Sequence, residues 1–449
     1  MPQDPSIAGR FGHLRGALRE FPALLWSFLY FFFLLTGYYV LRPVRDAMGA
    51  ANDPSAVFPV GMVDWFAARG VALGDYQIQV LFTGTFISML LLQPVYGALV
   101  ARFPRRLFLP VVYLAFIACL LAFRFAFEAG LPGRGGLFFV FVAVFNLFAV
   151  SVFWSFMADI YTDPQARRLY GFIAAGGTLG GLLGPEITSR LVGQLGVGNM
   201  LLVSAGFLGL CLLCILKLGP WARAREAAAG QQGGEEAIGG GVLEGLRRIA
   251  TEPLLRAFAV LMFFGVGVGT LLYNEQNAIV RAMTLGNPAA AEQATAFFAM
   301  LDKWVNWLVL VLQVLVTRAV LVRWGVAPLL LGPALLILAG YCLLWATPLP
   351  MLVAIVQVGT RASEFALAKP ARETIYTRVD REARYKAKAA IDTVVYRGGD
   401  LAFAWAYKPL AAFGSSVVFG AGVLVAGGLT FGAWRLVREQ AKLPDKPPG

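Results

Sequence analysis

Runs of about 20 consecutive apolar residues recur along the whole chain and constrain its fold more than any other feature. A helix of that length crosses roughly 30 Å of hydrocarbon, the thickness of a bilayer core. With 58% hydrophobic residues and a mean hydropathy of +0.69, the 449-residue chain is more apolar than a soluble core requires. The sequence therefore predicts an all-α membrane protein with twelve transmembrane helices. The expected spans are residues 22–41, 78–100, 107–127, 137–162, 170–192, 198–218, 254–281, 295–316, 326–347, 350–372, 390–408 and 412–434.

Basic residues are distributed unevenly among the connections. Of the 38 Lys and Arg residues, 23 fall in the two tails and in the connections that follow the even-numbered spans. The other connections hold five, which are Arg42, Arg45, Arg69, Arg134 and Lys408. By the positive-inside rule, both termini are cytoplasmic. The basic excess is thus explained by orientation in a lipid bilayer, and no nucleic-acid partner is expected.

The inventory of reactive residues excludes several kinds of site. His13 is the single histidine, and the four cysteines all fall within expected spans. Histidine-based metal sites and Ser-His-Asp triads are therefore excluded, and Cys211 and Cys214 are expected to be packing residues. We predict no enzymatic activity, no cofactor and no metal site.

The expected spans divide into two groups of six. The connection at residues 219–253 is rich in Gly, Ala, Gln and Glu, which is typical of a flexible linker, and its "VLEGLRRIATEP" segment predicts a short amphipathic helix. "IYTDPQARRLYGFIAA" (160–175) and "IYTRVDREARYKAKAA" (375–390) occupy equivalent places in the two groups. Two pseudo-symmetric six-helix bundles facing a central cavity are therefore expected. The predicted units are a tail (1–21), a first bundle (22–218), the linker (219–253), a second bundle (254–436) and a tail (437–449).

Ionisable residues inside the spans require a partner, water or a function, because a charge at mid-bilayer costs about 2.5 to 3.5 kcal/mol even on lenient scales. They fall on helical faces. If the first helix continues past Leu41, its Tyr38, Arg42 and Arg45 share a face; Tyr273, Asn277 and Arg281 are spaced similarly in span 7.

Three later spans carry further charges. Span 8 contains Asp302 and Lys303, and span 11 stacks Asp392, Tyr396 and Asp400 beside Arg397. Span 10 aligns Gln357, Arg361, Glu364 and Arg372 on one stripe, with Lys369 and Glu373 turned away from it. These faces are expected to line one wet cavity.

Structural interpretations compete with a functional one for these charges. Arg42 and Arg45 would be interfacial anchors if the first span ends early. Asp302 with Lys303, and Arg361 with Glu364, would neutralise each other locally. Arg124 with Glu128, and Glu186 with Arg190, are interpreted as structural i, i+4 pairs.

Inward-facing arginines predict an anionic solute, because the guanidinium fork matches phosphate and carboxylate groups. The predicted substrate-binding residues are Tyr38, Arg42, Arg45, Tyr273, Asn277, Arg281, Lys303, Arg361, Lys369 and Arg372. The predicted coupling or gating residues are Asp46, Glu275, Asp302, Glu364, Glu373, Lys386, Lys388, Asp392, Arg397 and Asp400.

Four segments carry family resemblances. "GALVARFPRRLFLP" (97–110) is similar to a loop signature of the major facilitator superfamily. "YYVLRPVRDAMG" (38–49), "SVFWSFMADIYT" (151–162) and "KPARETIYTRVDREARYKAKAAIDTVVYRGGD" (369–400) resemble the ATP/ADP exchange transporters of plastids and intracellular bacteria, and more closely their shorter relatives in free-living bacteria.

The resemblance implies a major facilitator-like antiporter of a bacterial inner membrane that exchanges ATP for ADP. The family's important first-span lysine falls on Arg45, its Lys-Glu pair on Arg372 and Glu373, and its "KGKAAID" on Lys386, Lys388 and Asp392. Two family glutamates fall near Asn146 and near Tyr273, with Glu275 two residues after Tyr273.

Several functions remain open. Within transport, organic phosphate/phosphate exchange or proton coupling through Asp46, Glu275 or Glu364 would use the same arginines. A non-transporting lipid scramblase or scaffold is the alternative of another class. The expected form is a monomer that carries a small anionic solute, a nucleotide or other phosphorylated compound, by alternating access.

Overall fold

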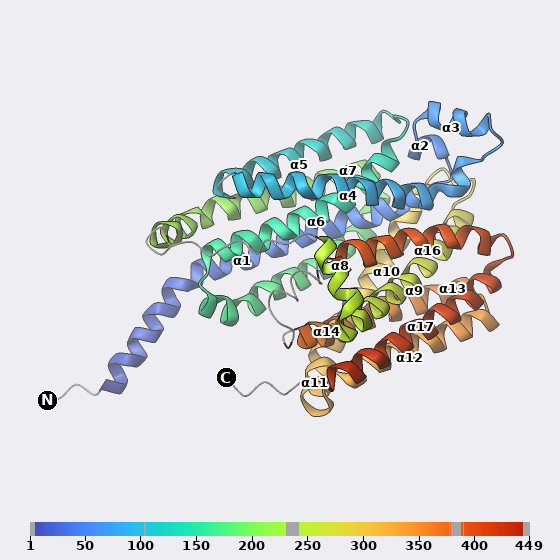
Figure 1. Ribbon diagram of the computed structural model, residues 1–449. Helices are drawn as coiled ribbons and strands as arrows, with labels where there is room; N and C mark the ends of the chain where they lie inside the picture. The colour runs from blue at the N-terminus through green and yellow to red at the C-terminus, as the bar shows by residue number, and fades with distance from the viewer. Residues whose placement is uncertain are drawn as a thin grey trace.

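The computed structural model describes residues 5–102, 105–229, 242–376, 378, 388 and 390–442, and in these ranges the chain forms helices without β-strands (Figure 1). Nine helical segments of this part are long and apolar enough to cross a membrane, and one of them, Arg168–Ala224, has 57 residues and contains two spans. The predicted all-α membrane fold with many transmembrane helices is confirmed.

The first half contains five long helices. They are α1 (Pro5–Gly49), α4 (Gln77–Arg102), α5 (Arg105–Glu128), α6 (Arg134–Ile160) and α7 (Asp163–Ala229). Short helices α2 (Pro54–Val57), α3 (Val60–Ala67) and η1 (Leu73–Tyr76) lie between α1 and α4. Within α7, Gly196 has φ +76° and ψ 162°, a conformation that glycine adopts without penalty, so the chain turns there and α7 supplies two spans.

The second half begins with α8 (Val242–Thr251), which confirms the amphipathic helix predicted in the linker. The following helices are α9 (Pro253–Met283), α10 (Ala290–Leu312), α11 (Arg318–Trp324), α12 (Ala327–Ala346), α13 (Pro350–Ser363), α14 (Lys369–Tyr376), α16 (Tyr396–Ala411) and α17 (Ser415–Gln440). Three π-helical turns, η2 (Gln313–Thr317), η3 (Glu364–Ala368) and η4 (Ile391–Val395), join or precede helices of this half.

Several helices extend beyond the predicted spans. Helix α1 begins at Pro5, inside the predicted tail, and continues to Gly49 through Pro43. Proline removes one backbone hydrogen bond, a loss that neighbouring helices compensate in membrane proteins. Helix α7 continues to Ala229, past the predicted bundle boundary at residue 218. The loop-signature residues 103–104 lie outside the described residues, as do the side chains of 93–107.

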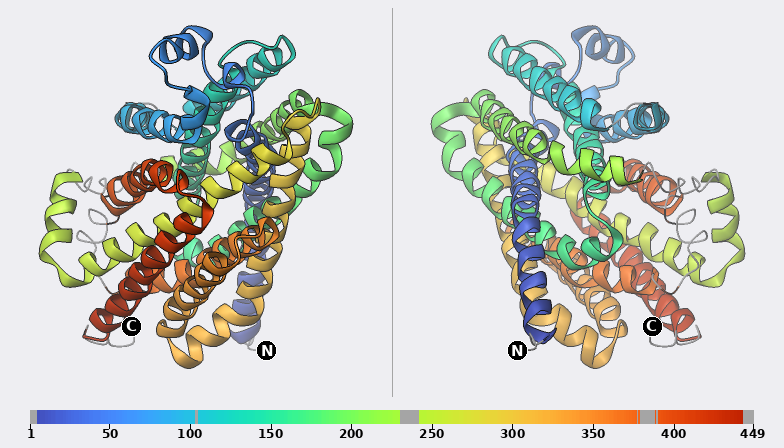
Figure 2. Two further views of the ribbon diagram at one scale, coloured as in Figure 1. Left: turned by 90° about the vertical axis from the view of Figure 1, so that its right-hand side faces the viewer. Right: turned by 90° about the vertical axis from the view of Figure 1, so that its left-hand side faces the viewer.

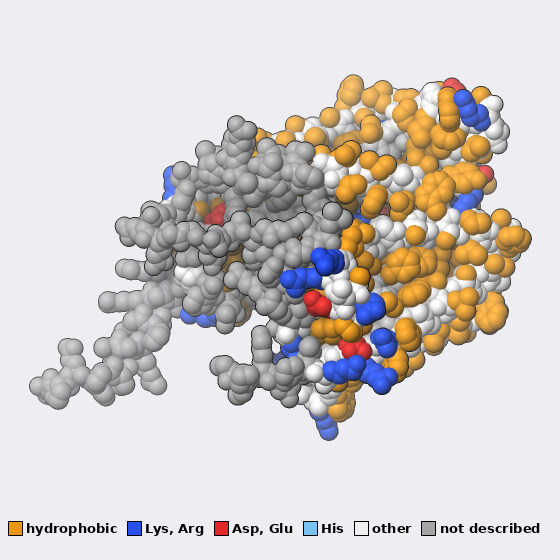
Figure 3. Space-filling model, viewed as in Figure 1, with side chains coloured by type: hydrophobic (Ala, Val, Ile, Leu, Met, Phe, Trp, Pro, Cys, Tyr) orange, Lys and Arg blue, Asp and Glu red, His pale blue; other side chains and the backbone are white. Residues whose placement is uncertain are grey.

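The two halves form two groups of helices, seen along their length in Figure 1 and obliquely in Figure 2. Both chain ends lie at one end of the molecule, here called the terminal end, and α2 and α3 lie at the other, here called the loop end (Figure 1). Hydrophobic side chains dominate the visible surface toward the loop end, and Lys and Arg gather nearer the terminal end (Figure 3). This is the pattern expected of a lipid-facing belt with a basic margin.

Glycines allow α1 and α7 to pack closely. A Cβ atom on Gly180 would lie 2.4 Å from the Phe32 carbonyl oxygen, and one on Gly184 would lie 2.5 Å from the Tyr39 Cβ. Small residues let helix backbones approach in membranes, where packing holds helices together. The contact fixes the rotation of α1 and so the direction in which its arginines point.

The halves meet along two seams, where α7 packs against α10 and α4 packs against α16. Helix α1 also contacts α10. The charged faces of α1, α10 and α13 consequently meet near the middle of the molecule.

Candidate functional site

Helix α1 remains helical through the "LRPVRD" segment, so Arg42 and Arg45 project from it into the protein. Their side chains are only 17% and 16% exposed. The alternative that these two arginines are interfacial anchors beyond a short span is therefore wrong.

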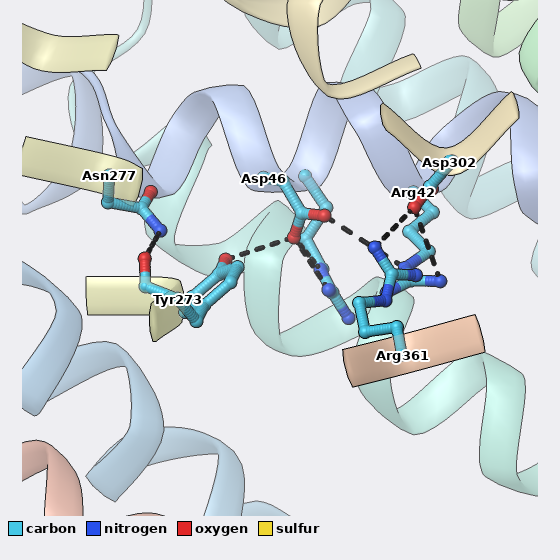
Figure 4. A network of polar contacts seen from close by, with 7 residues as sticks. Arg42, Asp46, Tyr273, Asn277, Asp302 and Arg361 are labelled. Carbon is cyan, nitrogen blue, oxygen red and sulfur yellow. Dashed lines mark hydrogen bonds and ion pairs between the residues drawn. The ribbon is translucent and has the colours of Figure 1, made fainter. Parts of the chain in front are cut away.

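Asp302 of α10 joins arginines from both halves (Figure 4). Its Oδ1 atom lies 2.8 Å from Arg361 Nη1 and 3.6 Å from Arg42 Nη1. The Asp302 side chain is 2% exposed, and a carboxylate so deeply buried requires cationic partners to remain ionised.

Asp46 of α1 forms a second junction between the halves (Figure 4). Its Oδ1 accepts hydrogen bonds from Arg45 Nη2 at 2.6 Å and from the Tyr273 hydroxyl of α9 at 3.0 Å. Arg42 Nε lies 3.9 Å from the other oxygen of Asp46. Each half thus supplies a carboxylate that the opposite half contacts.

We call the six residues of these two junctions the central cluster: Arg42, Arg45, Asp46, Tyr273, Asp302 and Arg361. Three guanidinium groups face two carboxylates, which leaves one surplus positive charge. Among the described residues, Arg42 Nε and Asp302 Oδ2 are buried without a hydrogen-bond partner. The surplus charge and the unused Arg42 Nε–H donor therefore remain available to an anion, whereas Asp302 Oδ2 can only accept.

The locally neutralised pairs considered from the sequence do not form. Lys303 turns away from Asp302 and pairs with Glu186 of α7, Nζ to Oε2, at 2.7 Å. Glu364 pairs with Arg372, eight residues along, at 2.5 Å, and not with Arg361. Each charged side chain instead points to a neighbour determined by tertiary packing.

The two pairs interpreted as structural are confirmed. Arg124 lies 2.9 Å from Glu128, and Arg190 lies 2.5 Å from Glu186. Glu186 has the additional contact with Lys303, so it also connects the two halves.

Aromatic and amide side chains border the central cluster. Tyr38 is 9% exposed and packs edge-on against Tyr39 at 5.2 Å between ring centroids. The Arg42 guanidinium lies 5.8 Å from the centroid of the Tyr39 ring. Asn277 donates to the Tyr273 backbone carbonyl at 2.7 Å (Figure 4), which places it one turn from the cluster.

Arg281 lies at the loop end, away from the central cluster. It donates to the Gly74 carbonyl at 2.8 Å, the Ala51 carbonyl at 3.1 Å and Gln77 Oε1 at 3.1 Å. Asn52 donates to the Thr284 hydroxyl at 3.1 Å beside it. We call Asn52, Gln77, Arg281 and Thr284 the loop-end clasp, because its contacts join the two halves.

Further polar contacts between α4 and the second half support the loop-end clasp. Gln79 lies 3.3 Å from Asn274 and donates to the Ala404 carbonyl at 3.0 Å, and Trp405 donates to Thr83 at 3.1 Å. A cleft of about 380 Å³ adjoins the clasp, lined in part by Gln77, Arg281 and Lys408. Apart from Arg281, sequence reasoning missed these residues as site residues; the polar "YQIQV" start of an apolar run was the available signal.

Other predicted residues lie within the second half. Asp400 accepts from Thr270 at 2.7 Å and lies 3.5 Å from Arg397, and Lys388 pairs with Glu373 at 2.6 Å. Lys369 is exposed, with its amine 5.9 Å from the Phe365 ring centroid.

Glu275 is 4% exposed and accepts from Ser415 at 3.1 Å. Lys386 lies outside the described residues, as does the side chain of Asp392. Among the residues that the structure places, no group of three or more His, Cys, Asp or Glu residues is arranged to hold a metal ion.

The chain is similar to known membrane transporters over most of its length. The family model described as Major Facilitator Superfamily matches residues 58–365, which include helices of both halves. No curated protein matches the chain by sequence.

Solved structures with a similar fold include three kinds of transporter. A POT family transporter in complex with 5-aminolevulinic acid has a TM-score of 0.62 at 12% identity, with 94% of this chain and 96% of that chain covered. A nucleoside transporter has a TM-score of 0.60 at 12% identity, with 94% and 98% covered. A D-xylose-proton symporter has a TM-score of 0.59 at 14% identity, with 91% and 97% covered.

Proposed function

Because the chain belongs to the major facilitator superfamily and is a multi-pass membrane transporter of that type, we propose that it carries an anionic, phosphorylated solute by alternating access. The observation that carries this proposal is the central cluster, where Arg42, Arg45 and Arg361 meet two buried carboxylates. A surplus cation between the two halves favours a solute that brings negative charge.

The preferred solute is a nucleotide, and the preferred reaction is exchange of one nucleotide for another. The resemblance of residues 38–49 and 369–400 to nucleotide exchangers supports this choice. Arginine forks suit the oxygens of a polyphosphate, and Tyr39 near Arg42 offers an aromatic surface for a base.

We assign gating to contacts at the loop end and at the terminal end of the molecule. If both termini face the cytoplasm of a bacterium, the loop-end clasp closes the external side in this conformation. The pairs Arg372 with Glu364 and Lys388 with Glu373 lie closer to the terminal end along α14 and would take part in closing the cytoplasmic side.

Proton-coupled anion transport is the second candidate, and Glu275 favours it. Its carboxyl group is buried against the Ser415 hydroxyl, and no Lys or Arg among the described residues pairs with it. Such a carboxyl group can bind and release a proton during a transport cycle.

A ligand panel tests the substrate class. Purified protein would be heated with ATP, ADP, other nucleotides, inorganic phosphate and sugar phosphates, and each ligand that raises the Tm would be tested for counterflow in proteoliposomes. We expect ATP and ADP to raise the Tm and to support counterflow.

Other results select other functions. A strong shift with sugar phosphates and none with nucleotides would indicate organic phosphate/phosphate exchange. No shift with any anion, combined with lipid movement between leaflets, would indicate a scramblase.

A further inference from the structure

We propose that Asp302 is an internal anion, which occupies the Arg42 guanidinium when the central site is empty and is displaced from it by the anionic group of the substrate. This inference rests on the proposed function, because it requires a transported anion that binds at the central cluster. It adds a specific competitor for that anion, supplied by the protein itself.

The two arginines hold Asp302 unequally. Arg361 Nη1 lies 2.8 Å from Asp302 Oδ1, within hydrogen-bond distance, and both residues belong to the second half, where α10 packs against α13. Arg42 Nη1 lies 3.6 Å from the same oxygen and reaches it from the first half. When the halves separate, the Arg361 pair can persist, whereas the Arg42 pair has to open.

Arg42 has the free capacity to accept a substrate. Its Nε is buried without a hydrogen-bond partner, and its nearest approach to Asp46 is 3.9 Å. Five donors on a guanidinium exceed what two carboxylate oxygens at 3.6 and 3.9 Å can use. A phosphoryl group offers several oxygens in a geometry that the fork can bind with two hydrogen bonds.

Asp46 is a poor candidate for the same role. Its Oδ1 already accepts three hydrogen bonds, from Arg45 Nη2 at 2.6 Å, from Arg45 Nε at 3.0 Å and from the Tyr273 hydroxyl at 3.0 Å. Asp302 has one oxygen, Oδ2, without any hydrogen-bond partner among the described residues. Because Asp302 has fewer hydrogen bonds than Asp46 and meets Arg42 across the two halves, Asp302 is the carboxylate that can release Arg42 to a substrate anion.

The charge of the central cluster determines whether loss of Asp302 strengthens or weakens anion binding. With Asp302 ionised, the central cluster has one surplus positive charge; with Asp302 neutral, it has two. A carboxylate tethered beside Arg42 competes with every incoming anion, because it is present at a high effective concentration. Removing this competitor should therefore tighten anion binding, whereas removing a residue with a purely structural role would leave binding unchanged or weaken it.

The experiment measures dissociation constants for ATP, ADP, pyrophosphate and inorganic phosphate by calorimetry on the full chain and on Asp302→Asn. We expect Asp302→Asn to bind these anions about tenfold more tightly, equivalent to about 1.4 kcal/mol, and to have a lower Tm without ligand. The control is Glu128→Gln, which also removes a carboxylate from an arginine pair but at an exposed position of α5. Its dissociation constants should equal those of the wild type.

Other outcomes decide against one proposal or both. A folded Asp302→Asn protein with unchanged or weaker anion binding would overturn the internal-anion role while leaving the proposed function intact. If the wild type binds pyrophosphate and phosphate but no nucleotide, and Asp302→Asn tightens both, the internal-anion role holds and the nucleotide substrate does not. If neither protein binds any anion, both proposals are wrong.

A second variant keeps the proposal testable if Asp302→Asn does not fold. Asp302→Ser is also neutral and leaves space for a bound anion. If neither neutral variant folds alone, inorganic phosphate added during purification should restore folded protein by taking the place of the missing carboxylate. Lack of such rescue would overturn the proposal.

Discussion

At the scale of single residues, Arg361 makes the shorter of the two arginine contacts to the buried Asp302 carboxylate. It supplies the 2.8 Å contact to a carboxylate that is 2% exposed, whereas Arg42 remains 3.6 Å away. Removing one partner of a buried ion pair costs about 3 to 5 kcal/mol, because the other charge is left uncompensated. We expect Arg361→Gln to lower the free energy of unfolding by about this amount and to weaken anion binding at least about tenfold, measured by denaturation and calorimetry.

A matched variant separates this effect from the loss of any arginine. Arg124→Gln removes a partner of Glu128, whose side chain is 63% exposed, so its effect on stability should stay below about 1 kcal/mol. Arg361→Lys keeps the positive charge but lacks the guanidinium fork. Its loss of stability should lie between those of Arg361→Gln and Arg124→Gln. Wild-type stability in Arg361→Gln would show that Asp302 is not held as an ion by this pair.

Helical spacing identified most of the central cluster from the sequence but could not pair its members. Arg42, Asp302 and Arg361 were all expected to face a cavity, and the structure brings them together. Their partners depend on how three separate helices are rotated and placed in depth, which no local pattern contains. Lys303, adjacent to Asp302 in sequence, accordingly binds a carboxylate of another helix.

At the scale of elements, the close contact of α1 with α7 determines where the arginines of α1 point. A Cβ at Gly184 would lie 2.5 Å from the Tyr39 Cβ and 2.8 Å from the Thr36 carbonyl oxygen. We expect Gly184→Val to destabilise the protein by about 1 to 3 kcal/mol or more, the cost of overpacking, as measured by thermal unfolding.

Gly193 on the same helix provides the control for Gly184. A Cβ there meets nothing within 4 Å, so Gly193→Val should leave the Tm nearly unchanged. If both substitutions lower the Tm equally, the helix propensity of valine, and not contact with α1, would explain the loss of stability.

Helix length explains why the expected position of Arg281 beside Tyr273 differs from its place in the structure. Eight residues of helix rise about 12 Å, so side chains on one face of α9 reach very different depths. Tyr273 therefore contacts the central cluster, whereas Arg281 binds carbonyls at the loop end. The sequence pattern predicts a shared face reliably, but depth depends on where the helix enters the membrane.

At the scale of the whole molecule, the loop-end clasp and the central cluster both join the halves in the same conformation. Asn52 Nδ2 and Thr284 Oγ1, from opposite halves, lie 3.1 Å apart. If alternating access separates the loop end, a covalent bond at this point should arrest transport. We expect oxidation of the Asn52→Cys, Thr284→Cys double variant to abolish counterflow in proteoliposomes and reduction to restore it.

The single variants show whether the new bond is responsible for the arrest. Asn52→Cys and Thr284→Cys, each alone, should transport equally well under oxidising and reducing conditions. Both contain the four native cysteines, so any disulfide among those would affect all three proteins alike. Undiminished transport by a fully cross-linked double variant would mean that the loop end does not open during the cycle.

Contacts that join the halves through the central cluster also predict how transport is driven. An empty carrier that changes conformation must break the Arg42 contact with Asp302 and the Tyr273 contact with Asp46, and nothing replaces them. An anionic substrate, as proposed, would supply new partners for the arginines, so the loaded carrier would have the lower barrier. We therefore expect labelled ATP to enter proteoliposomes only when they contain unlabelled nucleotide, and a pH gradient alone to drive no uptake. Proton-driven uptake into empty vesicles that is lost in Glu275→Gln would contradict exchange and identify Glu275 as the proton-binding group.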